Sequence, residues 1–387
     1  MKTRRDFISS ALTVGLGAGL IGKTPAAVVR KSYRGPNIVI VRFGGGVRRR
    51  ETINERRSFA PYLLRELAPQ GTFYRNMEID KFKDLETSHG EGTLNILTGK
   101  YTQYQVESKD PFDQRFEPEV PTIFEYLRKA YDLPTHQTLL INGEDRSQEE
   151  FYNFSNHHLF GASFRSQTLS LFRYKAWLLE KQLSGNVAED RRRELEKNLR
   201  EMKQIDYRTN GKVNEQPEIR SFWEKWHSYY GKDGLKNARG DRLLTELGLW
   251  SMNHLKPRLM MINYNDPDYV HWGNMTHYTE GIKVIDQGIR QLVAHTKLDP
   301  FYRDNTIFCI VPDCGRDTNP LLSVPCQHHF NSKSAHEIWC LLFGPGVEKG
   351  KVIDKRVDQT QIAGTLGKLM GAPTQFADNN VLEEAIA

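Results

Sequence analysis

Several acidic, histidine and cysteine residues stand beside long apolar runs of the sequence, where a fold could gather them around a metal ion. The candidate ligands are Asp268, His271, Asp313, Cys314, His328, His329 and His336. Carboxylate and imidazole groups bind divalent ions of the zinc or manganese kind, and a cysteine thiolate can replace imidazole at zinc. One Asp–His pair, such as Asp268 with His271, also occurs as a helix cap. Several such residues after separate strands predict a metal centre.

The apolar runs themselves predict buried β-strands. They are rich in β-branched residues and cover residues 37–41, 138–141, 259–264, 306–311 and 338–343. Segments with helical periodicity separate them, at residues 58–67, 122–131, 278–296 and 360–370. Strands that alternate with helices predict a parallel α/β sheet with helices on both faces. Ligand sites in such sheets lie beyond the carboxyl ends of the strands, where these loops would gather.

The middle of the chain has a different pattern. From about residue 148 to residue 250 no strong strand run occurs, while residues 169–183 and 189–205 have helical periodicity. The second of these two segments is highly charged, which is typical of a solvated helix face with i,i+4 ion pairs. We therefore expect a helical insertion or cap over the sheet.

The N-terminus has the features of an export signal. The pair Arg4 and Arg5 precedes an apolar, glycine-rich stretch at residues 11–22, and small residues follow. This arrangement resembles a twin-arginine signal. The apolar stretch is shorter than the ~20 residues that span a membrane. We expect a signal at residues 1–27 and a periplasmic or otherwise extracytoplasmic domain at residues 28–387, with no integral membrane span after signal removal.

Composition excludes several classes of protein. The 387 residues include 54 Lys and Arg against 48 Asp and Glu, so the net charge of +6 is small for this length and does not indicate a nucleic-acid-binding protein. Half of that excess lies in the predicted signal. Aromatic residues form 11% of the chain, which argues against disorder. The four cysteines are too few for a disulfide scaffold, and their pairing stays open.

The order of these segments resembles the alkaline phosphatase superfamily, which includes sulfatases, nucleotide pyrophosphatases and cofactor-independent phosphoglycerate mutases. Six segments carry the resemblance: an opening strand with its loop at 37–47, a nucleophile helix with a Leu-Thr-Gly ending at 87–101, an Asp…His metal segment at 268–271, an Asp-His-Gly-like segment at 311–316, a strand end at 343–347, and a closing helix with its tail at 357–382. Each segment is a weak signal alone, but their shared order is specific. The resemblance covers residues 36 to about 382 apart from the insertion, and it implies a three-layer α/β sandwich.

The resemblance also implies the chemistry of the site. In that superfamily two metal ions clamp an in-line displacement at phosphorus or sulfur, and a metal-activated side chain attacks. One ion would bind Asp268, His271 and a later histidine, for which His329 and His336 are the candidates. The other ion would bind Asp313, the residue after it, an Asp at the end of the first strand, and the nucleophile.

The sequence departs from this pattern at three points, and all of them fall in the second metal site. The first-strand loop begins with Arg42 and has no carboxylate, and Cys314 stands where the superfamily has histidine. The nucleophile position falls on His89, with the hydroxyl groups of Thr87 and Ser88 beside it. These last three residues are the catalytic candidates, although Thr87 and Ser88 are also typical helix N-caps.

These features lead to two functional hypotheses. The first is an exported, metal-dependent hydrolase that acts on phosphate or sulfate esters of an anionic small molecule or polymer and binds one or two ions of zinc, calcium or manganese. The second is a catalytically inactive, sulfatase-like protein that needs no metal and serves as an extracytoplasmic binding or structural subunit with protein partners. The retained residues Asp268 and His271 favour the first hypothesis, and the altered second site favours the second.

Overall fold

The structure is a computed structural model. It describes residues 31–80, 88–101, 104–106, 116–143, 152–205, 216–231, 240–271, 273–318, 327–328, 332–378 and 380–387. One compact unit comprises Ser32–Ala387. The predicted signal at residues 1–27 lies outside the described residues, and so do Thr87 and His329.

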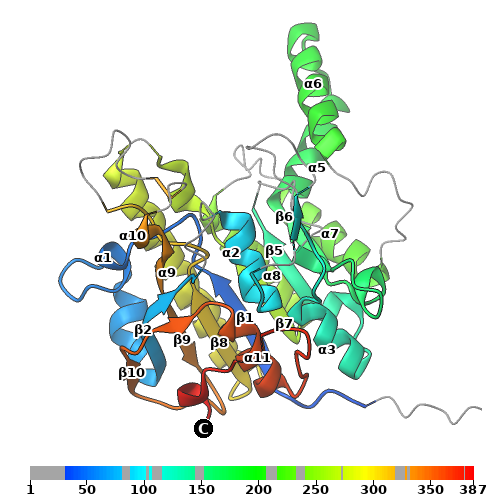
Figure 1. Ribbon diagram of the computed structural model, residues 1–387. Coiled ribbons are helices and arrows are strands. Elements are labelled where there is room, and N and C mark those ends of the chain that lie inside the picture. The colour runs from blue at the N-terminus through cyan, green and yellow to red at the C-terminus, as the bar shows by residue number, and fades with distance from the viewer. Residues whose placement is uncertain are drawn as a thin grey trace, which may run out of the picture. The chain divides into compact units, whose positions relative to one another are not determined.

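Nine of the described strands form one mixed sheet, in the order β10-β2-β9-β8-β1-β7-β5-β6, with β11 paired to β2. They are β1 (Asn37–Arg42), β2 (Gly71–Glu78), β5 (Thr138–Asn142), β6 (Gln167–Ser170), β7 (Leu259–Asn263), β8 (Thr306–Val311), β9 (Glu337–Phe343), β10 (Lys351–Ile353) and β11 (Val357–Asp358). β1 lies between β7 and β8 in the middle of the sheet and runs parallel to both (Figure 1). Two short strands, β3 (Tyr104–Val106) and β4 (Phe116–Pro118), pair separately.

Strand β9 departs from the parallel arrangement that its apolar sequence predicted. It pairs antiparallel with both β8 and β2. An apolar run shows that a strand is buried, but it carries no information on direction. As a result the start of β9, and not its end, lies at the edge where β1, β7 and β8 finish. The segment before β9, which contains His328 and His336, therefore approaches that same edge.

The described α-helices are α1 (Arg49–Thr52), α2 (His89–Thr98), α3 (Ile123–Tyr131), α5 (Leu171–Leu183), α6 (Glu189–Ile205), α7 (Pro217–Tyr230), α8 (Asp241–Leu255), α9 (Met275–Leu298), α10 (Lys333–His336) and α11 (Gln361–Met370). None of these described helices is both long and apolar enough to pass through a bilayer.

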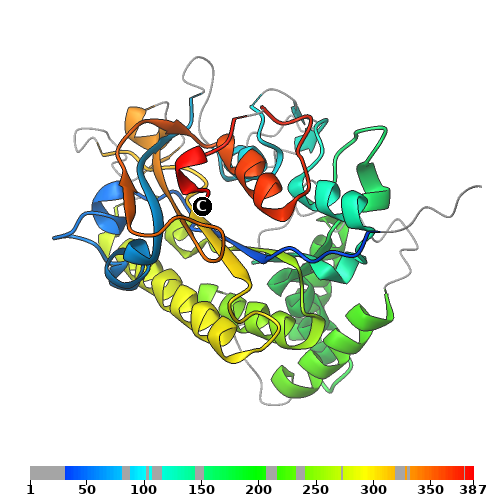
Figure 2. The same ribbon diagram turned by 90° about the horizontal axis from the view of Figure 1, so that it is seen from below.

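Helices cover both faces of the sheet, as Figure 2 shows. The side chains of β1 alternate between two apolar cores. Ile38 and Ile40 belong to the core that contains residues of α2, α3 and α11. Val39 and Val41 belong to the core that contains residues of α8 and α9. This period of two is required of a strand that is covered on both faces. The three-layer α/β sandwich predicted from the sequence is therefore confirmed.

The segment at about residues 148–250 contributes helices and also one strand. α5, α6 and α7 lie within it, and β6 extends the sheet by pairing with β5. β6 was not evident from the sequence because its four residues include one large apolar side chain, Leu169. On α6, Arg193 and Glu189 form an exposed i,i+4 ion pair of the predicted kind. The limits of a separate insertion stay a prediction.

Helix α2 approaches the end of β8 closely. Its residue Gly92 is buried, and an added Cβ atom would lie 2.0 Å from the backbone oxygen of Asp313. Glycine inside a helix is normally less favourable than alanine, so the close approach explains why glycine stands here. The contact brings the first turn of α2, which begins with His89, against the loop after β8.

We expect Gly92→Ala to destabilise the protein by about 1–3 kcal/mol, because the methyl group must push α2 away from Asp313. Gly248→Ala in α8 is the matched control, since the nearest atom there is the movable Cδ1 of Ile262 at 3.1 Å. The control should stay within about 1 kcal/mol of the parent protein. Chemical denaturation measures both free energies of unfolding. Equal stability of the two variants would contradict the tight contact between α2 and β8.

Candidate active site

Four charged or ionisable side chains meet at the edge of the sheet where the parallel strands end. Arg42 is the last residue of β1, and His89 is the first residue of α2. Asp268 lies in the short helical turn Asp266–Tyr269 after β7, and Asp313 follows β8. Because β1, β7 and β8 are parallel neighbours, their carboxyl ends reach the same edge. The loops converge there as the sequence pattern predicted.

Three imidazole nitrogens face one oxygen of Asp268. The distances from its Oδ1 to the Nε2 atoms are 2.8 Å for His89, 2.9 Å for His328 and 3.1 Å for His271. The Nε2 atoms of His89 and His328 lie 3.0 Å apart. Three ring nitrogens and one carboxylate oxygen therefore share a small volume.

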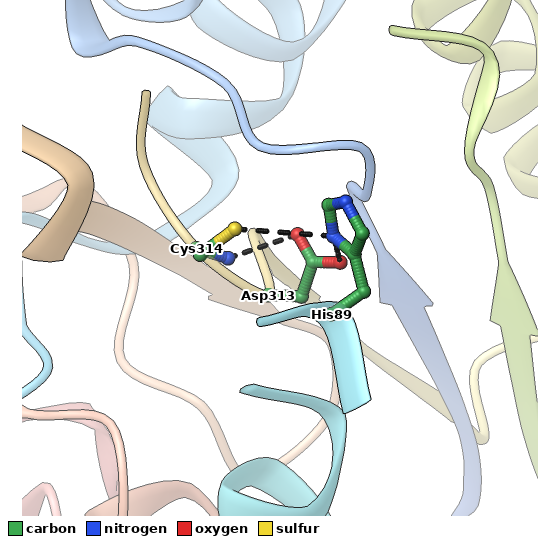
Figure 3. A group of neighbouring side chains, drawn as sticks. All are labelled: His89, Asp313 and Cys314. Carbon is green, nitrogen blue, oxygen red and sulfur yellow. Dashed lines mark hydrogen bonds and ion pairs between the residues drawn. The ribbon is translucent and has the colours of Figure 1, made fainter. Parts of the chain in front are cut away.

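The second carboxylate, Asp313, is fully buried and holds the other ring nitrogen of His89 (Figure 3). Its Oδ2 lies 2.6 Å from Nδ1 of His89 and 3.6 Å from Nη1 of Arg42. Its Oδ1 accepts a 2.9 Å hydrogen bond from the backbone N–H of Cys314 and a 3.4 Å bond from that of Gly46. The Cys314 Sγ is 3.9 Å from Nδ1 of His89. His89 thus bridges the two carboxylates.

These groups shift one another's pKa. Burial alone would lower the pKa of His89, but Asp268 and Asp313 raise it well above its usual value. Burial alone would raise the pKa of both carboxyl groups, yet the charge of His89 holds the pKa of Asp268 well below its usual value. His89 and Arg42 together lower the pKa of Asp313 to about 2. Burial raises the pKa of the Cys314 thiol to about 11, so this group is neutral near pH 7.

The start of α2 is fixed by Ser88, which is the helix N-cap. Its Oγ accepts a 3.1 Å hydrogen bond from the backbone N–H of Glu91 and donates to the carboxylate of Glu91 at 3.3 Å. The helix ends at Gly99, whose φ of 68° is left-handed, which explains the glycine of the Leu-Thr-Gly ending. This placement turns His89 toward Asp268 and Asp313, while the Ser88 hydroxyl is bonded to Glu91.

A buried arginine ties the loops of the site together. The guanidinium of Arg316 donates to four backbone oxygens, which belong to Gly45, Gly46, Pro267 and Val270. It thereby joins the glycine loop after β1 to the loop that carries Asp268. Gly45 has a left-handed φ of 84°, and a Cβ there would lie 2.5 Å from the backbone nitrogen of Asp268. The glycines let the two loops approach closely, as the sequence suggested.

The structure brings together most of the residues that the sequence singled out. These are His89, Asp268, His271, Asp313 and Cys314. His336 lies elsewhere, with its Nδ1 3.1 Å from the backbone oxygen of Ile79. Thr87 and His329 are outside the described residues. The disulfide question is partly answered, because the described cysteines 309, 314 and 340 are free thiols.

One residue of the site, Arg42, was not assigned to it from the sequence. His328, which contacts Asp268, was among the candidate histidines, although the ligand choice named His329 or His336. In the sequence, Arg42 was noted only because it stands where the superfamily pattern has a carboxylate. A basic residue at a strand end where an acid is expected was the available signal for Arg42.

The group around Asp268 fits one divalent ion. Two ring nitrogens 3.0 Å apart share a hydrogen bond only when one carries a proton and the other does not. Three ring nitrogens also compete for a single carboxylate oxygen here. A cation that accepts lone pairs from Asp268, His271 and His328 removes both conflicts, and two nitrogens with one oxygen are a zinc-type donor set. His89, Asp268 and His328 are close enough to share an ion.

The group around Asp313 does not fit a second ion. His89, Asp313 and Cys314 are close together, but the thiol is neutral and the guanidinium of Arg42 stands beside the carboxylate. Two divalent ions and Arg42 would carry five positive charges against the two carboxylates. Uncompensated charge of this size is very unfavourable in a buried site.

No protein-family model and no curated protein sequence matches the chain. Solved structures do match it. Alkaline phosphatase PafA matches with a TM-score of 0.54 and 10% identity, over 92% of this chain and 100% of that chain. The phosphonate monoester hydrolase SpPMH from Silicibacter pomeroyi matches with a TM-score of 0.51 and 14% identity, over 91% and 76% of the two chains. The PsFucS1 sulfatase from Pseudoalteromonas sp. matches with a TM-score of 0.50 and 14% identity, over 92% and 74%. The chain therefore has the fold of the alkaline phosphatase superfamily, to which sulfatases belong.

Proposed function

We propose that the protein is a divalent-metal-dependent hydrolase of phosphate or sulfate esters. The observation that carries this proposal is the convergence of three imidazole Nε2 atoms on one oxygen of Asp268 at the carboxyl edge of the sheet. A carboxylate with two of these imidazoles is a three-ligand set of the kind that holds catalytic zinc-type ions in many folds. The matched structures, whose names identify a phosphatase, a sulfatase and a phosphonate monoester hydrolase, support the same class of reaction.

Asp268, His271 and His328 would hold the ion. A bound divalent ion supplies Lewis-acid polarisation of an ester oxygen and stabilises negative charge that develops there. Gln327 fixes the ring of His271, because its Oε1 lies 3.0 Å from Nδ1 and its Nε2 donates to the His271 backbone oxygen at 3.2 Å. Such outer contacts orient metal-binding histidines.

His89 takes the catalytic role that the sequence divided among Thr87, Ser88 and His89. The Asp313 carboxylate accepts the Nδ1 proton of His89 and fixes the ring, which leaves Nε2 facing the centre of the site. An imidazole held in this way by a carboxylate is a typical general base. A base needs an unprotonated Nε2, so this role requires a bound ion that offsets the carboxylates which raise the His89 pKa. In that state we assign to Nε2 of His89 the removal of a proton from the attacking water.

A second candidate function rests on the charge of the same cluster. A protonated His89 between Asp268 and Asp313, with Arg42 beside Asp313, gives two positive and two negative charges. This balance is reached without any ion. It favours a catalytically inactive protein that acts as an extracytoplasmic binding or structural subunit. In that case Asp268→Ala combined with His271→Ala would still complement a deletion strain.

We also propose export by the twin-arginine route, on the basis of residues 1–27. Export is part of both candidate functions. It rests on the sequence alone.

His328→Ala should weaken zinc binding at least about tenfold, because it removes one of the converging nitrogen donors. His336→Ala is the matched control, since His336 contacts the Ile79 backbone instead. Chelator-treated protein is titrated with Zn²⁺, and bound metal is measured by elemental analysis. Equal zinc affinity of the two variants would contradict the assignment of the metal ligands.

His89→Gln should lower kcat for aryl phosphate or sulfate hydrolysis by about 10²–10⁴-fold, the usual contribution of a general base. His136→Gln is the control, because His136 lies before β5 at the opposite end of the strands. Steady-state kinetics of the metal-loaded proteins give kcat and KM. Absence of turnover by the parent protein, with all ester types, would favour the inactive candidate.

Replacing both Arg4 and Arg5 with lysine keeps the charge but removes the paired-arginine motif. We expect this variant to accumulate in the cytoplasm. Lys23→Arg serves as the control with an intact motif. Cell fractionation and immunoblotting locate the three proteins, and unchanged export of the double variant would exclude the twin-arginine route.

A further inference from the structure

Arg42 is a buried cation at the centre of the site. It is the last residue of β1 and is 5% exposed. Its Nη1 donates to the Thr93 hydroxyl at 2.8 Å, and its Nη2 contacts the Tyr264 backbone oxygen at 3.4 Å and the Asn265 Oδ1 at 3.3 Å. These partners are neutral oxygens. They hold the guanidinium in place without cancelling its charge.

The nearest carboxylate does not saturate Arg42. Nη1 lies 3.6 Å from the Asp313 Oδ2, whereas paired arginine and carboxylate groups normally form two bonds of about 2.7–2.9 Å. The Nε atom is buried and has no hydrogen-bond partner among the residues that the structure describes. The closest contact of the Asp313 Oδ2 is instead Nδ1 of His89, at 2.6 Å. Arg42 therefore keeps the capacity to bind another anion.

A small cavity lies beside the guanidinium. Its volume is about 50 Å³, and its lining includes Arg42, His89 and Tyr152 together with the acidic residues Asp241 and Asp266. Burial, followed by the neighbouring Asp266, raises the pKa of Asp241 well above its usual value. The cavity has several times the volume that one water molecule needs. A larger cavity of about 640 Å³ shares Asp266 and Tyr269 with the small one. The small cavity can hold a small charged group next to Arg42, and the larger cavity can hold a larger group attached to it.

We propose that Arg42 replaces the second metal ion as a fixed cation, so that the site binds one divalent ion per chain and Arg42 binds the oxyanion group of the substrate. This inference rests on the proposed hydrolase function and specifies its substrate as an anionic ester. A guanidinium matches the geometry of phosphate and sulfate oxygens and stays charged at every physiological pH.

The first test is metal stoichiometry. Chelator-treated protein is titrated with Zn²⁺ in a calorimeter, and the expected result is one ion per chain. Arg42→Asp supplies the carboxylate whose absence the sequence showed and removes the competing charge. We expect it to bind a second ion. Two ions in the parent protein would overturn the role of Arg42 while leaving the hydrolase proposal standing, and no ion would overturn the hydrolase proposal itself.

The second test uses inorganic phosphate and inorganic sulfate as probes. Zinc-loaded Arg42→Met should bind at least one of them more than tenfold more weakly than the parent protein, with zinc stoichiometry unchanged. Arg42→Lys keeps the charge without the planar fork and should fall between the two. Arg258→Met is the matched control, because Arg258 contacts Asn37 at the opposite end of β1. Thermal unfolding confirms that each variant is folded.

Unchanged anion affinity in both Arg42 variants would overturn the anion-binding role. If Arg42→Met does not fold, Arg42→Lys decides the question, since a purely structural cation predicts parent-like affinity for a lysine variant. If the parent protein binds the anion but no metal, and the Arg42 variants lose that binding, the result supports the role of Arg42 and contradicts the metal-dependent function. The two proposals therefore fail separately.

Discussion

The charge of two carboxylates at the buried edge of the sheet governs the arrangement of the site. An ionised carboxylate that is removed from water without partners is very unfavourable. Asp313 is fully buried and is met by His89, Arg42 and two backbone N–H groups. Asp268 is met by three imidazole rings. His89 contacts both carboxylates. A change in the positive charge near one carboxylate therefore also changes the electrostatic environment of the other.

The fold must hold these charged groups within hydrogen-bond distance of one another. Two buried polar side chains, Arg316 and Gln359, do so. Arg316 joins the glycine loop after β1 to the loop of Asp268 through backbone oxygens. Gln359 donates to the backbone oxygens of Pro312 and Asp313 and accepts from Asn95 of α2. These contacts fix α2 against the end of β8, next to the glycine that permits their approach. The site is thus built from backbone positions that the fold determines.

The sequence predicted the layers and the place of the site, because burial on two faces leaves continuous apolar runs and because parallel strands end at one edge. Asp268, His271, Asp313, Cys314 and His89 were recognised by residue type and order. The direction of β9 was not predictable, since apolar runs look alike in both directions. His328 was one of several candidate histidines, because residue type alone does not show which ring approaches Asp268. Arg42 was missed as a participant because its partners come from distant segments, at Thr93, Tyr264 and Asn265.

The charge of Arg42 gives the site a different net charge without and with a bound divalent ion. Without an ion, the positive charges of a protonated His89 and of Arg42 equal the negative charges of Asp268 and Asp313. This cluster is then neutral and does not attract an anion. With one divalent ion and a neutral His89, the positive charges exceed the carboxylates by one. That excess is compensated when an anionic ester group enters, so binding the ion converts a balanced cluster into an anion site. A lysine or histidine in place of Arg42 could lose its proton and remove the excess, whereas a guanidinium does not.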